Sequence, residues 1–434
     1  MAAPAQRTDA RAAATEARLA ALPSGGGAWA REARAQAVAR LRAMGLPMRR
    51  DEYWKYTDPS SLTQPEAPAA AVLRATDETP VFDAVGALTL TFVDGVFRPD
   101  LSDEAVLEGA EIVPLSEAMA RDIHWAREVY GVLEARGQTP VARPLAALNT
   151  ALATEGFAVR VTGRPSRPIR FRYLHEAEAS DAVIHHVVVV EEGAEVTVLE
   201  NGPAAARFNK VMEVEVADEA RFHHVRAQGR DHERRAATHM FARLGRESLF
   251  KSFTLTVNGR LTRNEHVIEF TGDDAVAHVA GACAGFGDFH HDDTVFVTHG
   301  AERCESRQVF KKVLRAGAKG VFQGKILVKE GAQKTDGYQI SQGLLLDDEA
   351  EFLAKPELEI YADDVKCSHG STVGAVDEDA LYYLRARGIP RAEAQNLLVL
   401  AFLGEAIEEI EDEALQEEIR GRVAGWIARR AKAA

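Results

Sequence analysis

The chain has 434 residues, of which 46% are hydrophobic and 27% charged, a balance typical of folded globular domains. Its net charge of −14 argues against general binding to nucleic acid or to anionic membranes, because both need basic surfaces. Three cysteines without a CxxC pair argue against a disulfide framework and favour a reducing, cytoplasmic environment. No apolar run approaches the roughly 20 residues that span a bilayer, and residues 1–21 lack the apolar segment of a secretory signal.

Residues 1–155 predict an N-terminal, mainly helical region with a short strand pair. Ala, Arg, Leu and Glu dominate residues 1–60, with Gly- and Pro-containing breaks that divide this segment into separate helices. The Pro- and Ala-rich residues 59–79 predict a linker. Residues 88–97 predict two short strands around an Asp-Gly turn pair, and mixed helix and loop follow.

Residues 156–375 have a different texture, which predicts a β core. Short runs of apolar residues alternate with polar ones, as at Phe253, Leu255 and Val257. A period of two is the pattern of half-buried strands, because successive side chains point to opposite faces.

A recurring phrase of acidic or glycine residues followed by Ala divides this core. Ala194 and Ala220 are 26 residues apart, Ala275 follows after 55, and Ala301 after another 26. Later steps shorten to between 14 and 18 residues. A period in the twenties indicates the stacked coils of a β-solenoid, with a small residue at each corner. A β-sandwich whose hairpins share one turn chemistry remains open on spacing alone.

Residues 376–434 predict a C-terminal helical region. Asp377 suits the N-cap of a first helix that Gly388 can close, and a second helix follows Pro390. Apolar residues recur at steps of three and four in the second and third helices, which predicts one buried stripe on each. The stripe residues are Leu397, Leu400, Leu403, Ile407 and Ile410, then Leu415, Ile419, Val423 and Ile427.

Cys367 and His369 are the candidate metal ligands. In a strand that follows Asp363-Asp364, residues two apart point the same way, so Val365, Cys367 and His369 share one face. Thiolate and imidazole suit iron, zinc and copper. The alternative is that Cys367 only continues the apolar face of Val365. Two ligands are too few for a closed metal site, so the remaining ligands must come from elsewhere, a protein partner being one source.

Other candidate residues predict less. Three pairs of adjacent histidines occur, at 185–186, 223–224 and 290–291. Neighbours in a strand point to opposite faces, so the two rings of a pair cannot bind the same ion. We expect these histidines at the surface or in sheet ladders. The sequence leaves open whether His290, Asp292 and His299 lie close together in space. Residues 319–326 lack the glycine spacing and the Ser or Thr of a phosphate-binding loop, so we interpret Gly320 and Gly324 as solenoid corners. Cys283 and Cys304 are expected to be core thiols.

The longest motif is residues 355–388, KPELEIYADDVKCSHGSTVGAVDEDALYYLRARG, and it strongly resembles the C-terminal signature of the SufD family. GLPMRRDEYWKYT at 45–57, RCESRQ at 303–308 and GKILVKEGAQKTDGYQ at 324–339 resemble further segments of that family. The resemblance covers nearly the whole chain in order. It implies a right-handed parallel β-helix flanked by N- and C-terminal α-helical regions.

The resemblance also implies a function. The family's members are scaffold subunits of the Suf machinery for iron–sulfur cluster assembly, which pair with SufB through their β-helices and bind the ATPase SufC through their C-terminal helices. The chain would then catalyse nothing alone and could form a homodimer when isolated. The family's Cys-Ser-His falls on residues 367–369, which makes His369 the first and Cys367 the second expected ligand of iron or of a transient cluster at the SufB–SufD interface. We expect no cofactor bound tightly to the isolated chain.

Three alternatives remain. A SufB-type paralogue shares the architecture, but it has Glu-His-Glu where this chain has Ser-His-Gly at 368–370, and it tends to carry more cysteines. A metal-dependent, cupin-like β enzyme would need a His-x-His pair, which the sequence lacks. A carbohydrate-active β-helix would need paired carboxylates and aromatic platforms, yet aromatic residues make up only 7%.

Overall fold

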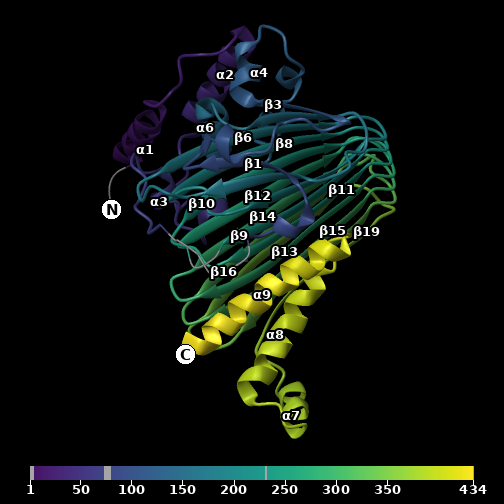
Figure 1. The fold of residues 1–434 in the computed structure, drawn as a ribbon. Helices are drawn as coiled ribbons and strands as arrows, with labels where there is room; N and C mark the ends of the chain where they lie inside the picture. The colour runs from purple at the N-terminus through teal and green to yellow at the C-terminus, as the bar shows by residue number, and fades with distance from the viewer. Residues whose placement is uncertain (1–3, 73–79, 230–231, 434) are drawn as a thin grey trace.

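The computed structural model describes residues 4–72, 80–229 and 232–433. Two long sheets lie face to face and helices cover their outer faces (Figure 1). The first sheet contains β1 (Leu88–Val93), β2 (Val96–Phe97), β5 (Ile169–Leu174), β7 (Glu195–Asn201), β9 (Arg221–Gly229), β11 (Leu249–Val257), β13 (Val276–Phe286), β15 (Glu305–Arg315), β17 (Asp336–Leu345) and β19 (Lys366–Gly374). The second contains β3 (Ala110–Pro114), β4 (Phe157–Val161), β6 (Asp181–Val190), β8 (Arg207–Val216), β10 (Arg235–Leu244), β12 (Leu261–Phe270), β14 (His290–His299), β16 (Lys319–Val328) and β18 (Glu351–Ile360).

Consecutive strands from β4 onward alternate between the two sheets, and each pairs in parallel with the strand two further along the chain. This is a parallel β-solenoid, as predicted, and it excludes the β-sandwich, whose sheets are antiparallel. The register pairs Leu249 with Val276, 27 residues on, and Val276 with Glu305, 29 residues on. Each coil therefore consists of two strands and two corners.

The predicted alanines lie at the corners and are buried there, among them Ala194, Ala220 and Ala275. The step of 55 residues spans a corner at which Ser248 replaces alanine; Ser248 is 1% exposed, and its hydroxyl donates a hydrogen bond to the Gly245 carbonyl. The shorter steps arise because the phrase occurs at both corners of the later coils, so each step covers half a coil.

The interpretation of Gly320 and Gly324 as corners is wrong, because both lie inside β16. Because glycine has no side chain, these two positions leave room in the interior of the solenoid. A side chain at position 324 would collide with the side chain of Gln339, which β17 directs into the lumen, that is, the interior between the two sheets.

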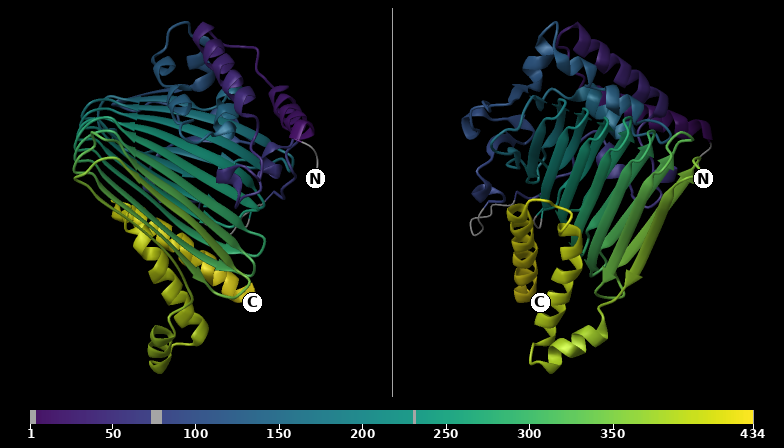
Figure 2. Two further views of the ribbon diagram at one scale, coloured as in Figure 1. Left: turned by 180° about the vertical axis from the view of Figure 1, so that it is seen from behind. Right: turned by 90° about the vertical axis from the view of Figure 1, so that its right-hand side faces the viewer.

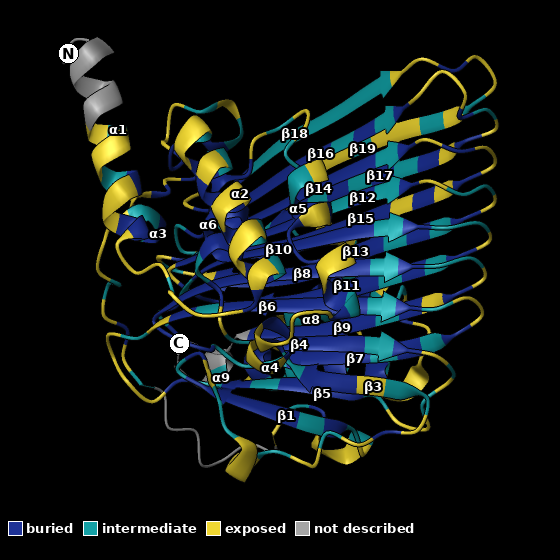
Figure 3. Ribbon diagram, turned by 90° about the horizontal axis from the view of Figure 1, so that it is seen from above, coloured by how far each residue is buried: buried dark blue, intermediate teal, exposed yellow. Residues whose placement is uncertain are grey.

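The N-terminal region packs on the outer face of the second sheet (Figures 2 and 3). Its helices are α1 (Pro4–Leu19), α2 (Ala28–Met44), α3 (Ser60–Thr63), α4 (Leu115–Ala120), α5 (Val132–Arg136) and α6 (Pro144–Leu152), with short 3-10 turns at η1 (Glu52–Trp54), η2 (Asp83–Val85), η3 (Pro99–Leu101) and η4 (Trp125–Glu128). The helix breaks and the strand pair β1–β2 are confirmed. Although the predicted boundary lies at 155/156, β1, β2 and β3 are already strands of the two sheets. Part of the predicted linker, 73–79, lies outside the described residues.

The C-terminal helices are α7 (Glu378–Ala386), α8 (Arg391–Ile407) and α9 (Glu413–Ala433). The Asp377 carboxylate accepts hydrogen bonds from the amides of Asp379 and Ala380, which confirms the N-cap. The predicted stripe of α9 is buried throughout. The predicted stripe of α8 is wrong at Leu397, whose side chain is 43% exposed. The reason is that the first part of α8 projects beyond the sheet together with α7 (Figure 2).

Candidate functional site

The solenoid ends in an open coil formed by β18 and β19. Among the described strands, β19 pairs with β17 alone and β18 with β16 alone. The opposite end is closed differently, since β2 pairs antiparallel with β1 and β3 antiparallel with β4. An open terminal strand presents unpaired backbone groups and lumen-facing side chains to solvent or to another chain.

Cys367 lies on the inward side of this last coil. The register places it opposite Gly337, and a Cβ built on that glycine would lie 3.2 Å from the Cys367 Sγ. The half-buried side chain packs against a small apolar cluster that includes Ile326 and Val328. Burial raises the pKa of the Cys367 thiol above its ordinary value. The packing against an apolar cluster agrees with the interpretation that Cys367 continues the face of Val365, while its role as a metal ligand stays a prediction.

His369 lies two residues further along β19, opposite Gln339, and is exposed. Strand alternation places it on the same side of β19 as Cys367. Within the described residues, no group of three or more His, Cys, Asp or Glu side chains could hold a metal ion. The pair thus provides a sulfur and a nitrogen at an open end, and any further ligand has to come from outside the described part of this chain.

The adjacent histidines all lie in strands of the sheets, one of the two expected places, and most of them are buried. His185, His186, His224 and His291 are at most 2% exposed. His186 lies in the lumen, stacks on Phe171 and contacts the Tyr173 hydroxyl at 3.0 Å. The sequence pattern does not predict this burial, because the polar partners of these rings lie in other strands or in the N-terminal region.

This lumen network crosses several coils. The Glu200 carboxylate accepts hydrogen bonds from Lys210 and from Tyr173, the latter at 3.3 Å, and it contacts His224 Nε2 at 3.1 Å. Burial alone would raise the pKa of Glu200, but the charges of Lys210 and Arg226 hold it well below the ordinary value. Further along the lumen, Lys312 Nζ donates to Asp293 at 2.6 Å and contacts His291 at 2.9 Å.

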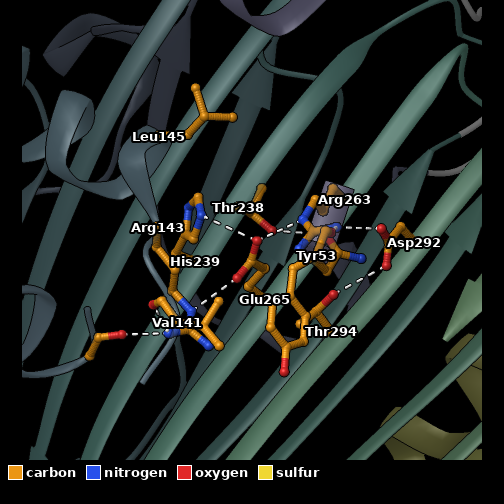
Figure 4. A network of polar contacts seen from close by, with 12 residues as sticks. Tyr53, Val141, Arg143, Leu145, Thr238, His239, Arg263, Glu265, Asp292 and Thr294 are labelled. Atoms are coloured by element: carbon orange, nitrogen blue, oxygen red, sulfur yellow. Dashed lines mark hydrogen bonds and ion pairs between the residues drawn. The ribbon is translucent and has the colours of Figure 1, made fainter. Parts of the chain in front are cut away.

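A second network joins the N-terminal region to the outer face of the second sheet (Figure 4). Arg263 donates to Glu265 at 2.6 Å and also to Asp292, and Arg143 donates to Glu265 at 3.0 Å. The Thr57 hydroxyl donates to Asp292 at 2.6 Å and contacts His290 at 3.0 Å. His299 instead contacts Ser306 in the lumen, so it does not join His290 and Asp292.

The C-terminal helices are fixed to the outer face of the first sheet. Leu403, Ile407 and Ile419 pack in an apolar cluster with sheet residues such as Phe253 and Val309. Ion pairs surround this contact: Lys251 with Glu411 at 2.6 Å and Arg307 with Glu409 at 2.8 Å. By contrast, the projecting part exposes Tyr382 (73%), Tyr383 (56%) and Leu397 (43%).

The fold is that of a β-solenoid protein with Cys367 and His369 at its open end and a projecting helical arm, and family models identify the class to which it belongs. The protein-family model "SUF system FeS cluster assembly, SufBD core domain" matches residues 173–402. A second family model, "SufBD protein N-terminal region", matches residues 19–166. The chain therefore belongs to the SufBD family.

Relatives with curated names are similar over much of the chain. The iron–sulfur cluster assembly protein SufD of Escherichia coli is 29% identical, covering 89% of this chain and 91% of that protein. A SufBD family protein of Synechocystis is 29% identical, covering 88% of this chain and 87% of that protein. SufD of Bacillus subtilis is 28% identical over 63% and 65%. Among the described residues, no helix is long and apolar enough to cross a membrane.

The buried histidines predict acid sensitivity. Burial lowers the pKa of His186 and His266 to about 3 and of His239 and His291 to about 4. The unfolded chain takes up protons near pH 6.5 and the folded chain only near pH 3–4, so stability falls as the pH falls below 6.5. Each such histidine contributes about 1.4 kcal/mol per pH unit in that window.

Urea unfolding of the chain at pH 7.5, 6 and 5 measures this slope. His266→Gln is expected to reduce it by about 1.4 kcal/mol per pH unit, while His369→Gln, which changes an exposed ring, serves as the control. Equal slopes for the parent chain and His266→Gln would contradict the assignment.

The three cysteines are expected to differ in reactivity. Cys283 and Cys304 are each 1% exposed, and burial raises their pKa values to about 12 and about 11. Because the thiolate is the nucleophile, iodoacetamide at pH 8 is expected to label Cys367 first and the other two only on unfolding. Peptide mass spectrometry reports the labelled positions, with Cys367→Ser as control. Rapid labelling of Cys283 in the folded chain would be the opposing result.

Proposed function

We propose that the chain is a SufD-type scaffold subunit of the Suf machinery for iron–sulfur cluster assembly. Membership in the SufBD family supports this function, and SufD proteins are among the relatives that cover most of the chain. Ser-His-Gly at 368–370 and a total of three cysteines favour the SufD type over the SufB-type paralogue. The observation that carries the proposal is the open terminal coil with Cys367 and His369 on one side.

In this proposal, a SufB subunit docks at the open coil and supplies the missing ligands. Iron, or a transient cluster, is the cargo, and the isolated chain binds none of it tightly. His369 is the more accessible donor, whereas Cys367 needs deprotonation and outward movement from its apolar cluster. Because thiolate ligation releases a proton, cargo capture is expected to weaken as the pH falls.

The chain itself is proposed to catalyse no reaction and to act in the cytoplasm. The energy would come from the ATPase SufC, bound to the projecting part of α7 and α8. Exposed tyrosines and leucine are typical of a protein-docking surface, and the rigid attachment of α8 and α9 to the first sheet would transmit a movement of that arm to the solenoid. Opening of the last coil around Cys367 is the expected consequence.

A metal-dependent β enzyme remains the competing function. It requires a complete metal site in the chain alone, and the described residues contain no group of three potential ligands. Metal analysis of the purified chain distinguishes the two functions, because a stoichiometric, chelator-resistant metal would favour the enzyme.

His369→Ala is expected to lower cluster yield several-fold without dissolving the complex, since an exposed ligand is lost and no core contact is changed. The chain is co-expressed with SufB and SufC, and iron and sulfide in the purified complex are measured. Ser368→Ala, on the opposite side of β19, is the matched control. A normal cluster content in His369→Ala would remove the proposed role of this residue.

Tyr382→Ala combined with Tyr383→Ala is expected to weaken retention of SufC at least tenfold while SufB remains bound, because the two exposed rings lie on α7, outside the strands β18 and β19 of the open coil. Loss of a central aromatic contact costs about 2 kcal/mol or more. Co-purification with quantitative mass spectrometry gives the ratio of subunits. Unchanged SufC content would place its binding surface elsewhere.

A further inference from the structure

The lumen contains a cluster of buried donors at the corner between β9 and β10. Arg226 and Gln228 extend into it from β9, and Arg234 enters it just before β10. Their exposed fractions are 4%, 2% and 0%. Long polar side chains this deeply buried need partners, because an unsatisfied buried donor costs about 1–3 kcal/mol.

Much of the donor capacity of this cluster has no acceptor within the described residues. Arg234 donates from Nη2 to the Asn258 carbonyl at 2.6 Å, but its Nε and Nη1 have no partner. Arg226 donates from Nη1 to the Thr238 hydroxyl at 2.9 Å, while its Nη2 has none. Gln228 accepts from Thr256 through Oε1, and its Nε2 is unpaired.

The charges of the described lumen are also unbalanced. Four buried cations, Lys210, Arg226, Arg234 and Lys312, face only two carboxylates, Glu200 and Asp293. The lumen histidines do not add anionic charge. Two positive charges therefore lack a counter-charge among the residues that the structure describes, in an interior where an uncompensated charge costs several kcal/mol.

Arg234 is the least compensated of these cations. Burial, and then the neighbouring charge of Arg226, lower its pKa to about 9. Gly259 keeps the backbone close to it: a Cβ there would lie 3.1 Å from Arg234 Cζ and 3.2 Å from the Thr262 hydroxyl. Thr262 is fully buried, and so is Cys283, whose thiol lies within the electrostatic reach of Arg234.

We propose that a small monovalent inorganic anion, of the size of chloride, occupies this corner of the lumen and accepts hydrogen bonds from Arg226 Nη2, Arg234 Nε and Nη1, and Gln228 Nε2. The unpaired groups are N–H donors, which selects an anion over a cation. The surrounding residues are almost completely buried, which selects a compact ion over an organic acid or a phosphate ester. The anion stabilises the coils around β9 and β10 and is independent of the cargo at the open end.

Bromide tests the site directly. Crystals of the full chain grown with sodium bromide in place of chloride are expected to show an anomalous peak at the bromine edge within hydrogen-bonding distance of Arg226 and Arg234. Arg234→Met is expected to remove the peak. Arg235→Met is the matched control, because the neighbouring guanidinium donates to the Ala69 and Glu233 carbonyls and its loss leaves the peak in place.

Thermal unfolding provides a second readout in solution. The melting temperature of the parent chain is expected to be about 3 °C higher in sodium bromide than in sodium gluconate at equal ionic strength. The melting temperature of Arg234→Met is expected to be the same in both salts. If Arg234→Met fails to fold, Gln228→Leu removes one donor without a charge and lowers the bromide peak. Water alone at the site, or equal melting of the parent chain in both salts, would overturn the proposal.

Discussion

The stacking of parallel coils is the constraint on which the rest of the molecule depends. Each coil satisfies its backbone hydrogen bonds only through the coils before and after it, so a solenoid always has two ends that need a separate solution. At the N-terminal end, the antiparallel strands β2 and β3 continue the two sheets beyond β1 and β4. At the other end the described chain leaves β18 and β19 with one neighbour each, and Cys367 and His369 lie there.

The lumen is the second consequence of this stacking. In-register parallel ladders bring equivalent positions of successive coils into line, so a polar side chain in one coil meets polar side chains in the next. Lys312 of β15 and Asp293 of β14 satisfy one another, as do Lys210 and Glu200, across the two sheets. Such buried networks are costly unless complete, and the incomplete part around Arg234 is therefore informative.

The two outer faces of the solenoid have different roles. The second sheet carries the N-terminal helices, tied down by the Arg263, Glu265 and Asp292 ion network. The first sheet carries α8 and α9 on an apolar face, with α7 projecting away from it. One side thus stabilises the stack, while the other attaches an arm suited to a partner, and the proposed scaffold function needs both.

Local chemistry in the sequence determined the elements: the period of two in the strands, the small residue at each corner, the Asp377 cap and the apolar stripe of α9, because each depends on near neighbours in the chain. The predicted ligand pair on one side of β19 follows from the same alternation. Only the tertiary structure decided that Gly320 and Gly324 serve the lumen, that His186 and His224 are buried, and that Leu397 is exposed. These outcomes depend on which coil or sheet lies opposite, that is, on contacts between residues 13 or more positions apart, which no local pattern records.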